Sequence, residues 1–376
     1  MPSQMSRNLA HSFFKVVSKL NSLFPPKQTT PRAERRRRHF LPPRPHFIHR
    51  LPVEILAWIF VLGAEDDDLL AVAVSHVCRT WRMTALRTPS LWRRIALVPE
   101  EQMCRERIHR AKACSLDVQL LPWRATRSRG IAPQRLDVHT VQLRMHLVLP
   151  YIHRWRSLEI VLPDYEPFLA NAALSGCCVS HKRGRAPLLE ELTLVYRNND
   201  DSKEFCLFSG CTPHLRRLTL DGLRLAWLPS LFGRLVFLDY THHAFSVGDD
   251  AVAELLAMLG VCAALRELRV LFPRRSPLAF VPPFRAQLGR VALRRLVCLH
   301  LRVETRDIPP DLTRLVTHLS TPSLISLHLT DIGHRRHTFP SLVHFMQSYP
   351  KLPSLQTVFV EYGWHGSFLR RRVTGR

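Results

Sequence analysis

A leucine triplet with the spacing LxxLxL recurs through the second half of this 376-residue chain and constrains its fold more than any other feature. The full copies begin at residues 189, 215, 235, 265, 296, 324 and 355, so successive starts lie 20 to 31 residues apart. The last two apolar positions of each copy alternate with other residues, which indicates a short strand with one buried side. A motif recurring at such intervals predicts stacked repeat units that share one core. Weaker copies occur earlier, at Trp155/Leu158/Ile160 and Leu116/Val118/Leu120.

The segments between the triplets favour helices. Residues 251–259 follow two aspartates and end at Gly260, residues 311–319 follow two prolines, and residues 340–346 precede the last triplet. Strands that alternate with helices at this period resemble leucine-rich repeats, although the asparagine that the family carries after each strand is missing. The resemblance implies an α/β fold in which residues 98–365 form an irregular leucine-rich-repeat solenoid with a parallel sheet.

The residues that alternate with the buried strand positions are expected to face solvent on the concave side of this sheet. They mix both charges with apolar side chains. That mixture favours a protein target over nucleic acid, whose phosphates favour an uninterrupted basic track. The candidate target-binding residues are Arg217, Asp221, Phe237, Asp239, Arg269, Leu271, His300, Arg302, His328 and Phe359.

Residues 51–92 predict a separate module of three short helices with more apolar surface than so small a unit can bury. Pro52 suits a first helical turn, Glu54 complements the positive end of the helix, and no glycine interrupts the run before Gly63. The apolar residues of this first helix cover well over the usual stripe of about 100°. We therefore expect a partner to cover the remainder.

The order of these residues resembles the F-box, the helical module by which substrate receptors dock onto the SKP-family adaptor of SCF ubiquitin ligases. The matching residues are Leu51-Pro52, Glu54-Ile55-Leu56, Ile59-Phe60, Val74, Val77-Cys78 and Trp81, followed by Leu91-Trp92, which matches the longer F-box-like form abundant in fungi. The resemblance covers residues 48–97. An ordinary three-helix cap on the following domain is the alternative interpretation.

The resemblance implies a substrate-receptor subunit of an SCF-type E3 ubiquitin ligase. The F-box-like module would bind a SKP-family adaptor, and through it a cullin-RING ligase, while the repeat domain would bind an unknown target protein. The adaptor-binding residues that it implies are Leu51, Pro52, Ile55, Leu56, Ile59, Val74, Cys78 and Trp81. Leu91 and Trp92 are expected to close the core of the module itself.

Positive charge is concentrated at the two ends of the chain. The formal net charge is +24, and residues 1–50 contain eleven Lys or Arg and one acid, Glu34. Residues 1–47 therefore predict a disordered basic leader with a short amphipathic helix in residues 8–24, and residues 366–376 predict a basic tail. The rival hypothesis is a non-catalytic leucine-rich-repeat scaffold whose basic arm contacts nucleic acid or another anionic partner.

The sequence contains no motif that predicts catalysis. GxxxxGK[ST], GxGxxG and HExxH are absent, and the nine cysteines form no CxxC pair, so we expect no enzyme activity, no cofactor and no metal site. Free thiols and the lack of an apolar run of about 20 residues predict an intracellular protein, cytoplasmic, nuclear or both, without stable membrane insertion.

Overall fold

The computed structural model describes residues 47–67, 69–97, 101–122, 136–178, 184–273, 288–304, 307–332, 341, 344–345, 357–364 and 367–373. The expected leader helix of residues 8–24, the arginine run at 35–38 and most of the expected helix at 340–346 lie outside these residues. The chain divides into two compact units, one of residues 1–94 with 109–114 and one of residues 95–108 with 115–376.

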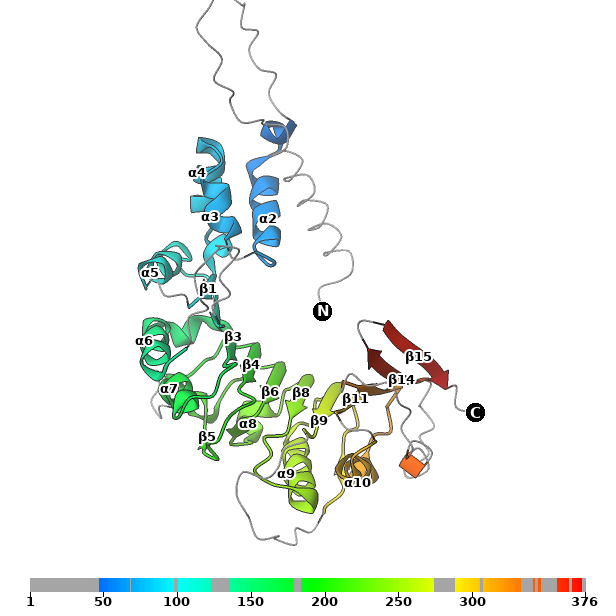
Figure 1. The fold of residues 1–376 in the computed structure, drawn as a ribbon. Coiled ribbons are helices and arrows are strands. Elements are labelled where there is room, and N and C mark those ends of the chain that lie inside the picture. The colour runs from blue at the N-terminus through cyan, green and yellow to red at the C-terminus, as the bar shows by residue number, and fades with distance from the viewer. Residues whose placement is uncertain are drawn as a thin grey trace, which may run out of the picture. The chain divides into compact units, whose positions relative to one another are not determined.

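The first unit consists of short helices (Figure 1). They are the 3-10 helix η1 (Phe47–Arg50), α2 (Val53–Gly63), α3 (Leu70–Ser75), α4 (Arg79–Arg87) and the 3-10 helix η2 (Pro89–Trp92). The amide of Leu56 donates to the Pro52 carbonyl at 3.1 Å, so the helical hydrogen bonds begin at the proline, as the sequence predicts. The three-helix module expected in this part of the chain is therefore present.

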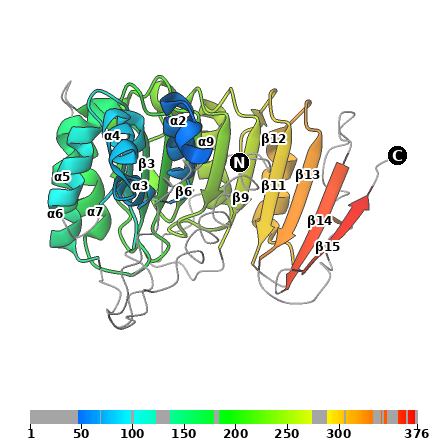
Figure 2. The same ribbon diagram turned by 90° about the horizontal axis from the view of Figure 1, so that it is seen from above.

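The second unit is built on one large sheet of eleven strands, which follow one another in sequence order (Figure 2). Every neighbouring pair from β2 to β14 is parallel, whereas β14 and β15 are antiparallel. The strands are β1 (Arg94–Ala96), β2 (Leu116–Leu120), β3 (Trp155–Val161), β4 (Glu191–Val195), β6 (Arg217–Asp221), β8 (Phe237–Thr241), β9 (Glu267–Leu271), β11 (Cys298–Val303), β13 (Ser326–Asp331), β14 (Thr357–Trp364) and β15 (Ser367–Val373).

The leucine triplets set the register of this sheet. The middle position of each triplet pairs with the middle position of the next, in the series Leu192, Leu218, Leu238, Leu268, Leu299, Leu327 and Val358. The leading leucines precede the strands and are buried as well, from Leu189 to Leu324. In the strands from β4 to β13 the triplet side chains thus point toward the core, and a register slip of one residue would expose them.

Helices connect many of the strands and lie on one face of the sheet (Figure 1). They are α5 (Glu101–Arg110), α6 (Val138–Val148), α7 (Leu169–Leu174), α8 (Pro229–Phe232), α9 (Gly248–Val261) and α10 (Pro310–His318), with 3-10 helices η3 (Leu149–Arg154), η4 (Ser175–Cys178) and η6 (Phe208–Gly210). Two small parallel pairs, β5 (Glu204–Phe205) with β7 (Arg224–Leu225) and β10 (Val291–Ala292) with β12 (Leu319–Ser320), complete the connections.

The structure confirms a mixed α/β fold with a large parallel sheet and helices after the first module. The narrower expectation of a leucine-rich-repeat solenoid is not confirmed, because the connections differ from one strand to the next and the last strand pair is antiparallel. Residues 367–373, expected in a basic tail, form β15 instead, since the backbone of β14 offers them an edge to pair with. Helix α9 begins at Gly248, so Asp249 and Asp250 lie in its first turn and do not cap it.

Candidate functional site

The side chains of the sheet that point away from the buried triplets form what we call the open face. Burial alternates along the strands as expected, with the triplet positions buried and most positions between them half-buried. The open face includes Glu191, Thr193, Val195, Arg217, Thr219, Phe237, Asp239, Glu267, Arg269, Cys298, His300, Arg302, Ser326, His328 and Thr330.

An aromatic ring between two arginines marks one part of the open face. The guanidinium of Arg217 lies 4.1 Å from the ring centroid of Phe237, and that of Arg269 lies 5.0 Å from it. Both arginines also pair with a carboxylate on their own side, Arg217 with Glu191 at 3.6 Å and Arg269 with Glu267 at 2.7 Å. The two cations shield the ring, which explains why Phe237 is 7% exposed although its backbone lies on an outward position.

Arg302 reaches across a neighbouring strand. Its guanidinium, which starts on β11, donates to the carboxylate of Asp239 on β8 and to the Thr241 hydroxyl at 3.3 Å. In the sheet register Leu271 of β9 lies between Thr241 and Arg302. Burial raises the pKa of Asp239 even though the Arg302 charge acts against that shift.

Two residues of the expected target-binding set are buried in the structure. Leu271 is 2% exposed, so its side chain does not face solvent; in the sheet register it lies between Arg302 and Thr241, which are hydrogen-bonded to each other. Asp221 is 5% exposed and accepts from Arg197 at 2.8 Å, which removes it from the solvent-facing row as well. Phe359 occupies the expected place on β14, paired in register with His328. Whether any of these residues binds a target is a separate matter that stays a prediction.

Two histidines stack at the other end of the open face. His300 on β11 and His328 on β13 are register partners, and their rings lie 4.0 Å apart with an angle of 4° between the planes. Burial, followed by the neighbouring His328 and Arg269, lowers the pKa of His300 to about 4. The imidazole of His300 is therefore neutral at neutral pH.

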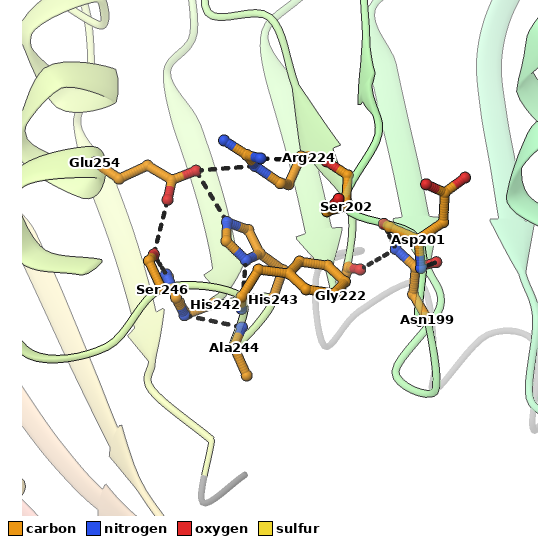
Figure 3. A network of polar contacts seen from close by, with 11 residues as sticks. Asn199, Asp201, Ser202, Gly222, Arg224, His242, His243, Ala244, Ser246 and Glu254 are labelled. Atoms are coloured by element: carbon orange, nitrogen blue, oxygen red, sulfur yellow. Dashed lines mark hydrogen bonds and ion pairs between the residues drawn. The ribbon is translucent and has the colours of Figure 1, made fainter. Parts of the chain in front are cut away.

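A polar network joins the end of β8 to α9 (Figure 3). His243 Nε2 lies 2.9 Å from Glu254 Oε1, Ser246 donates to Glu254 Oε2 at 2.9 Å, and His242 Nε2 lies 3.1 Å from the Ser246 hydroxyl. The Nδ1 atoms of His242 and His243 accept from the amides of Ala244 and Phe245, both at 3.0 Å. Each ring thus carries its proton on Nε2, and every ring nitrogen is engaged.

The protonation of this network follows from its burial. Burial, followed by the adjacent His243, lowers the pKa of His242 to about 3. Burial acts to raise the pKa of Glu254, but the hydrogen bonds and charge of His243 and the bond from Ser246 outweigh it and lower this pKa to about 2. Arg224 of β7 lies 3.5 Å from the same carboxylate. The ionised Glu254, held by His243, Ser246 and Arg224, forms a structural link between strand and helix, and the hydrogen bonds of the two histidines leave no ring nitrogen to bind a ligand.

The helical unit has a compact interior. Phe60 and Trp92 are 0% and 1% exposed, and the indole of Trp92 donates to the Ala85 carbonyl at 2.8 Å. Arg110 lies 4.5 Å from the Trp92 ring, within the range of a cation–π contact. Leu91 is buried too, so the expectation that Leu91 and Trp92 close the core of this module is confirmed.

The same unit leaves a broad apolar surface uncovered. Of the expected adaptor-binding residues, Leu51, Pro52 and Ile55 are exposed, and Ile59, Cys78 and Trp81 are half-buried. Leu56 and Val74 are 4% and 3% exposed, which corrects their assignment: both side chains pack inside the module. The burial follows helical geometry, because Leu56 and Phe60 are four residues apart on the inner side of α2.

Further large apolar side chains extend this surface beyond the residues that we had assigned to it. Trp58 is 65% exposed and Val77 is 60% exposed, and neither was included in the adaptor-binding set. The sequence held the signal, since Trp58 widens the apolar stripe of α2 and Val77 belongs to the matched motif. We name as the docking patch ten of the exposed or half-buried apolar residues of this unit: Leu51, Pro52, Val53, Ile55, Trp58, Ile59, Leu62, Val77, Cys78 and Trp81.

Residues 48–98 match the F-box-like family. No curated protein is similar enough to the chain to count as a match. The matched residues contain all of α2, α3 and α4, and the docking patch lies wholly within them. An F-box-like domain suggests, in general, a substrate-receptor role in SCF ubiquitin ligases and a SKP-family partner.

Two further expectations can be compared with the structure. All nine cysteines, including Cys78 of the F-box-like domain, are free thiols, as expected from their spacing. Among the described residues, no helix is both long enough and apolar enough to cross a bilayer.

Proposed function

We propose that this chain is a substrate-receptor subunit of an SCF-type E3 ubiquitin ligase. Its F-box-like domain docks on a SKP-family adaptor through the docking patch, and the adaptor links it to a cullin-RING ligase. The observation that carries the proposal is the uncovered apolar surface of α2 and of the turn before α4, within residues that match the F-box-like family.

The exposed residues explain why a partner is needed. Trp58, Val77 and Val53 are each more than half exposed, and Ile55 is 46% exposed. Burying apolar area contributes about 25 cal/mol per Å², so transferring a few such side chains into an interface provides several kcal/mol toward binding. Large apolar side chains exposed in this number on a small domain are typical of a protein interaction site.

We propose further that the open face of the sheet binds the target protein. Its charges are largely paired with one another, as in Arg269 with Glu267 and Arg302 with Asp239, so it offers hydrogen-bonding groups without a continuous basic track. Nucleic acid would require such a track to neutralise its phosphates. The in-register leucine triplets also support a leucine-rich-repeat origin for this sheet.

In this proposal the chain itself makes and breaks no bonds. It raises the effective concentration of a target lysine near the ubiquitin-loaded enzyme, because tethering makes a bimolecular encounter nearly intramolecular. The two binding functions then reside in separate units, and a substitution in one should leave the other intact.

Affinity capture of the full chain from its native cells, followed by mass spectrometry, tests both halves of the proposal. We expect a SKP-family adaptor and a cullin together with at least one further enriched protein. The matched variant Arg217→Glu changes a half-buried position of the open face, so it should retain the adaptor and cullin and lose the further protein. Capture of the folded chain without adaptor or cullin would contradict the proposal, and recovery of nucleic acid that dissociates in high salt would favour the scaffold hypothesis.

A further inference from the structure

Three metal-binding side chains meet on the open face. Cys298 and His300 are two residues apart on β11, so they point to the same side of the sheet, and His328 is the register partner of His300 on β13. The ligand atoms of the three residues all lie within 4.8 Å of one another. All three side chains are half-buried, so solvent can reach the group they form.

The distances are close to those of a metal site. A tetrahedral zinc ion, with bonds of about 2.0–2.3 Å to nitrogen and sulfur, holds its ligand atoms about 3.3–3.6 Å apart. Rotation of the side chains about their χ angles can bring atoms that start within 4.8 Å to this separation. The two rings now stack with their planes 4° apart, so binding would tilt them until their lone pairs converge.

The chemistry of the three ligand atoms suits a soft or borderline divalent cation, because such ions prefer thiolate sulfur and imidazole nitrogen. A coordinating thiol loses its proton to the metal, so cation binding at this place should release one proton.

The surrounding charges do not repel a cation strongly. Arg269, the register partner of His300 on β9, is bonded to Glu267, which is the register partner of Cys298. Arg302 is bonded to Asp239. These pairs are neutral overall, and a thiolate at Cys298 would supply one negative charge next to the bound ion.

The other histidine cluster offers a contrast. His242, His243 and Glu254 also bring their ligand atoms within 4.8 Å, but both ring nitrogens of each histidine and both carboxylate oxygens take part in hydrogen bonds. A metal ion there would break at least three of these bonds in a buried place. The three side chains of the open-face group are instead half-buried, so a metal ion can reach them from solvent.

We propose that Cys298, His300 and His328 bind one Zn²⁺ ion on the open face, with a fourth coordination position left to water or to a side chain of a bound protein. One thiolate and two imidazoles are ligands that zinc prefers, and three protein ligands leave an open position. The inference does not depend on the proposed ligase role, because the purified chain alone is sufficient to test it.

Cobalt substitution provides the test. The full chain is stripped with a chelator under reducing conditions and titrated with Co²⁺, which reports thiolate ligation through a charge-transfer band and four-coordination through intense visible bands. We expect both sets of bands in the wild type, their loss on addition of one equivalent of Zn²⁺, and an increase in melting temperature with Zn²⁺.

Two variants remove single ligands with little change in shape. Cys298→Ser should abolish the charge-transfer band, and His328→Phe, which keeps a ring stacked on His300, should weaken binding by at least about 100-fold, the upper end of what second-shell changes cost. The matched controls Cys211→Ser and His214→Phe alter an exposed cysteine and an exposed histidine elsewhere and should leave the spectrum unchanged. Circular dichroism confirms that each variant is folded. A wild type without the charge-transfer band, or an unchanged band in folded Cys298→Ser, would overturn the proposal.

Discussion

The ring of Phe60 in α2 lies 4.9 Å from the ring of Trp81 in α4, with the planes tilted by 57°. This contact joins the first and last α-helices of the F-box-like domain, and Phe60 is fully buried. The helices can therefore keep the docking patch in place only while this small core is intact. Because so few side chains form that core, each of them contributes a large part of its stability.

Phe60→Ala should unfold the F-box-like domain or destabilise it by about 3–5 kcal/mol, the usual cost of removing a buried aromatic ring. Amide hydrogen exchange can locate the effect: protection should fall in α2, α3 and α4, and stay unchanged in β4, β6 and β8. Equal protection of α2 in the wild type and the variant would show that Phe60 is not a core residue.

Ile55 and Leu56 are adjacent in sequence but should respond differently to truncation. Leu56→Ala removes a buried side chain and should cost about 2–5 kcal/mol of unfolding free energy. Ile55→Ala removes an exposed one, so its effect on stability should remain within about 0.5 kcal/mol, whereas adaptor binding should weaken by about 2 kcal/mol. Urea denaturation and a binding titration measure the two effects. If Ile55→Ala destabilised the protein more than Leu56→Ala, Ile55 and not Leu56 would be the buried residue of α2.

The position of the strands could be predicted from the sequence because two constraints coincide in each triplet. The alternation fixes which side chains are buried, and the leading leucine fixes where the strand begins, so the register from Leu192 to Leu327 follows from matching triplets. The burial of Leu271 could not be predicted in this way. At that position the alternation gives an outward side chain, whereas the structure places Leu271 between Thr241 and Arg302, whose side chain reaches two strands away to Asp239.

The group of histidines and cysteine on the open face could not be predicted from the sequence pattern either. Cys298, His300 and His328 each appear at outward positions in the sequence pattern, yet no local spacing such as CxxC connects them. Only the pairing of β11 with β13 places His328 opposite His300. In the F-box-like domain, the sequence pattern does not separate the inward from the outward sides of α2 and α3, which is why Leu56 and Val74 were placed in the adaptor-binding set although both side chains are buried.

Acid should destabilise the sheet unit through His242. Burial lowers the pKa of His242 to about 3 from 6.5, so below pH 6.5 the unfolded chain takes up a proton that the folded chain does not. The contribution of His242 to the free energy of unfolding is fully present above pH 6.5 and is lost as the pH falls toward 3. By pH 5 the loss amounts to about 2 kcal/mol.

Denaturation curves at pH 7 and pH 5 check this dependence. His242→Gln keeps a polar side chain beside Ser246, Glu254, His243 and Arg224 but cannot be protonated in this range. The variant should lose about 2 kcal/mol less than the wild type between the two pH values. The same loss in both proteins would exclude His242 as its source.

Gly222 and Gly260 should respond in opposite directions to replacement by alanine. Gly222 has a φ of +77°, and a Cβ atom there would lie 2.1 Å from the Tyr196 carbonyl oxygen, so Gly222→Ala should destabilise the protein by more than about 1 kcal/mol. Gly260 lies in α9 with nothing within 4 Å of an added Cβ. Gly260→Ala should stabilise the helix by up to about 1 kcal/mol. Thermal denaturation measures both effects. A Gly222→Ala variant as stable as the wild type would contradict the close approach of residue 222 to the Tyr196 carbonyl oxygen.

The most direct test of the account is a binding titration of the purified full chain with a purified SKP-family adaptor. We compare the wild type with the double variant Leu51→Ala/Pro52→Ala, and use Leu143→Ala, which truncates an exposed leucine on α6, as the matched control. The account predicts specific binding by the wild type and by Leu143→Ala, little dependence on salt, and no detectable binding by the double variant while hydrogen exchange shows the sheet unit intact. Equal affinity of the wild type and the double variant for the adaptor, or no affinity in either, would contradict it.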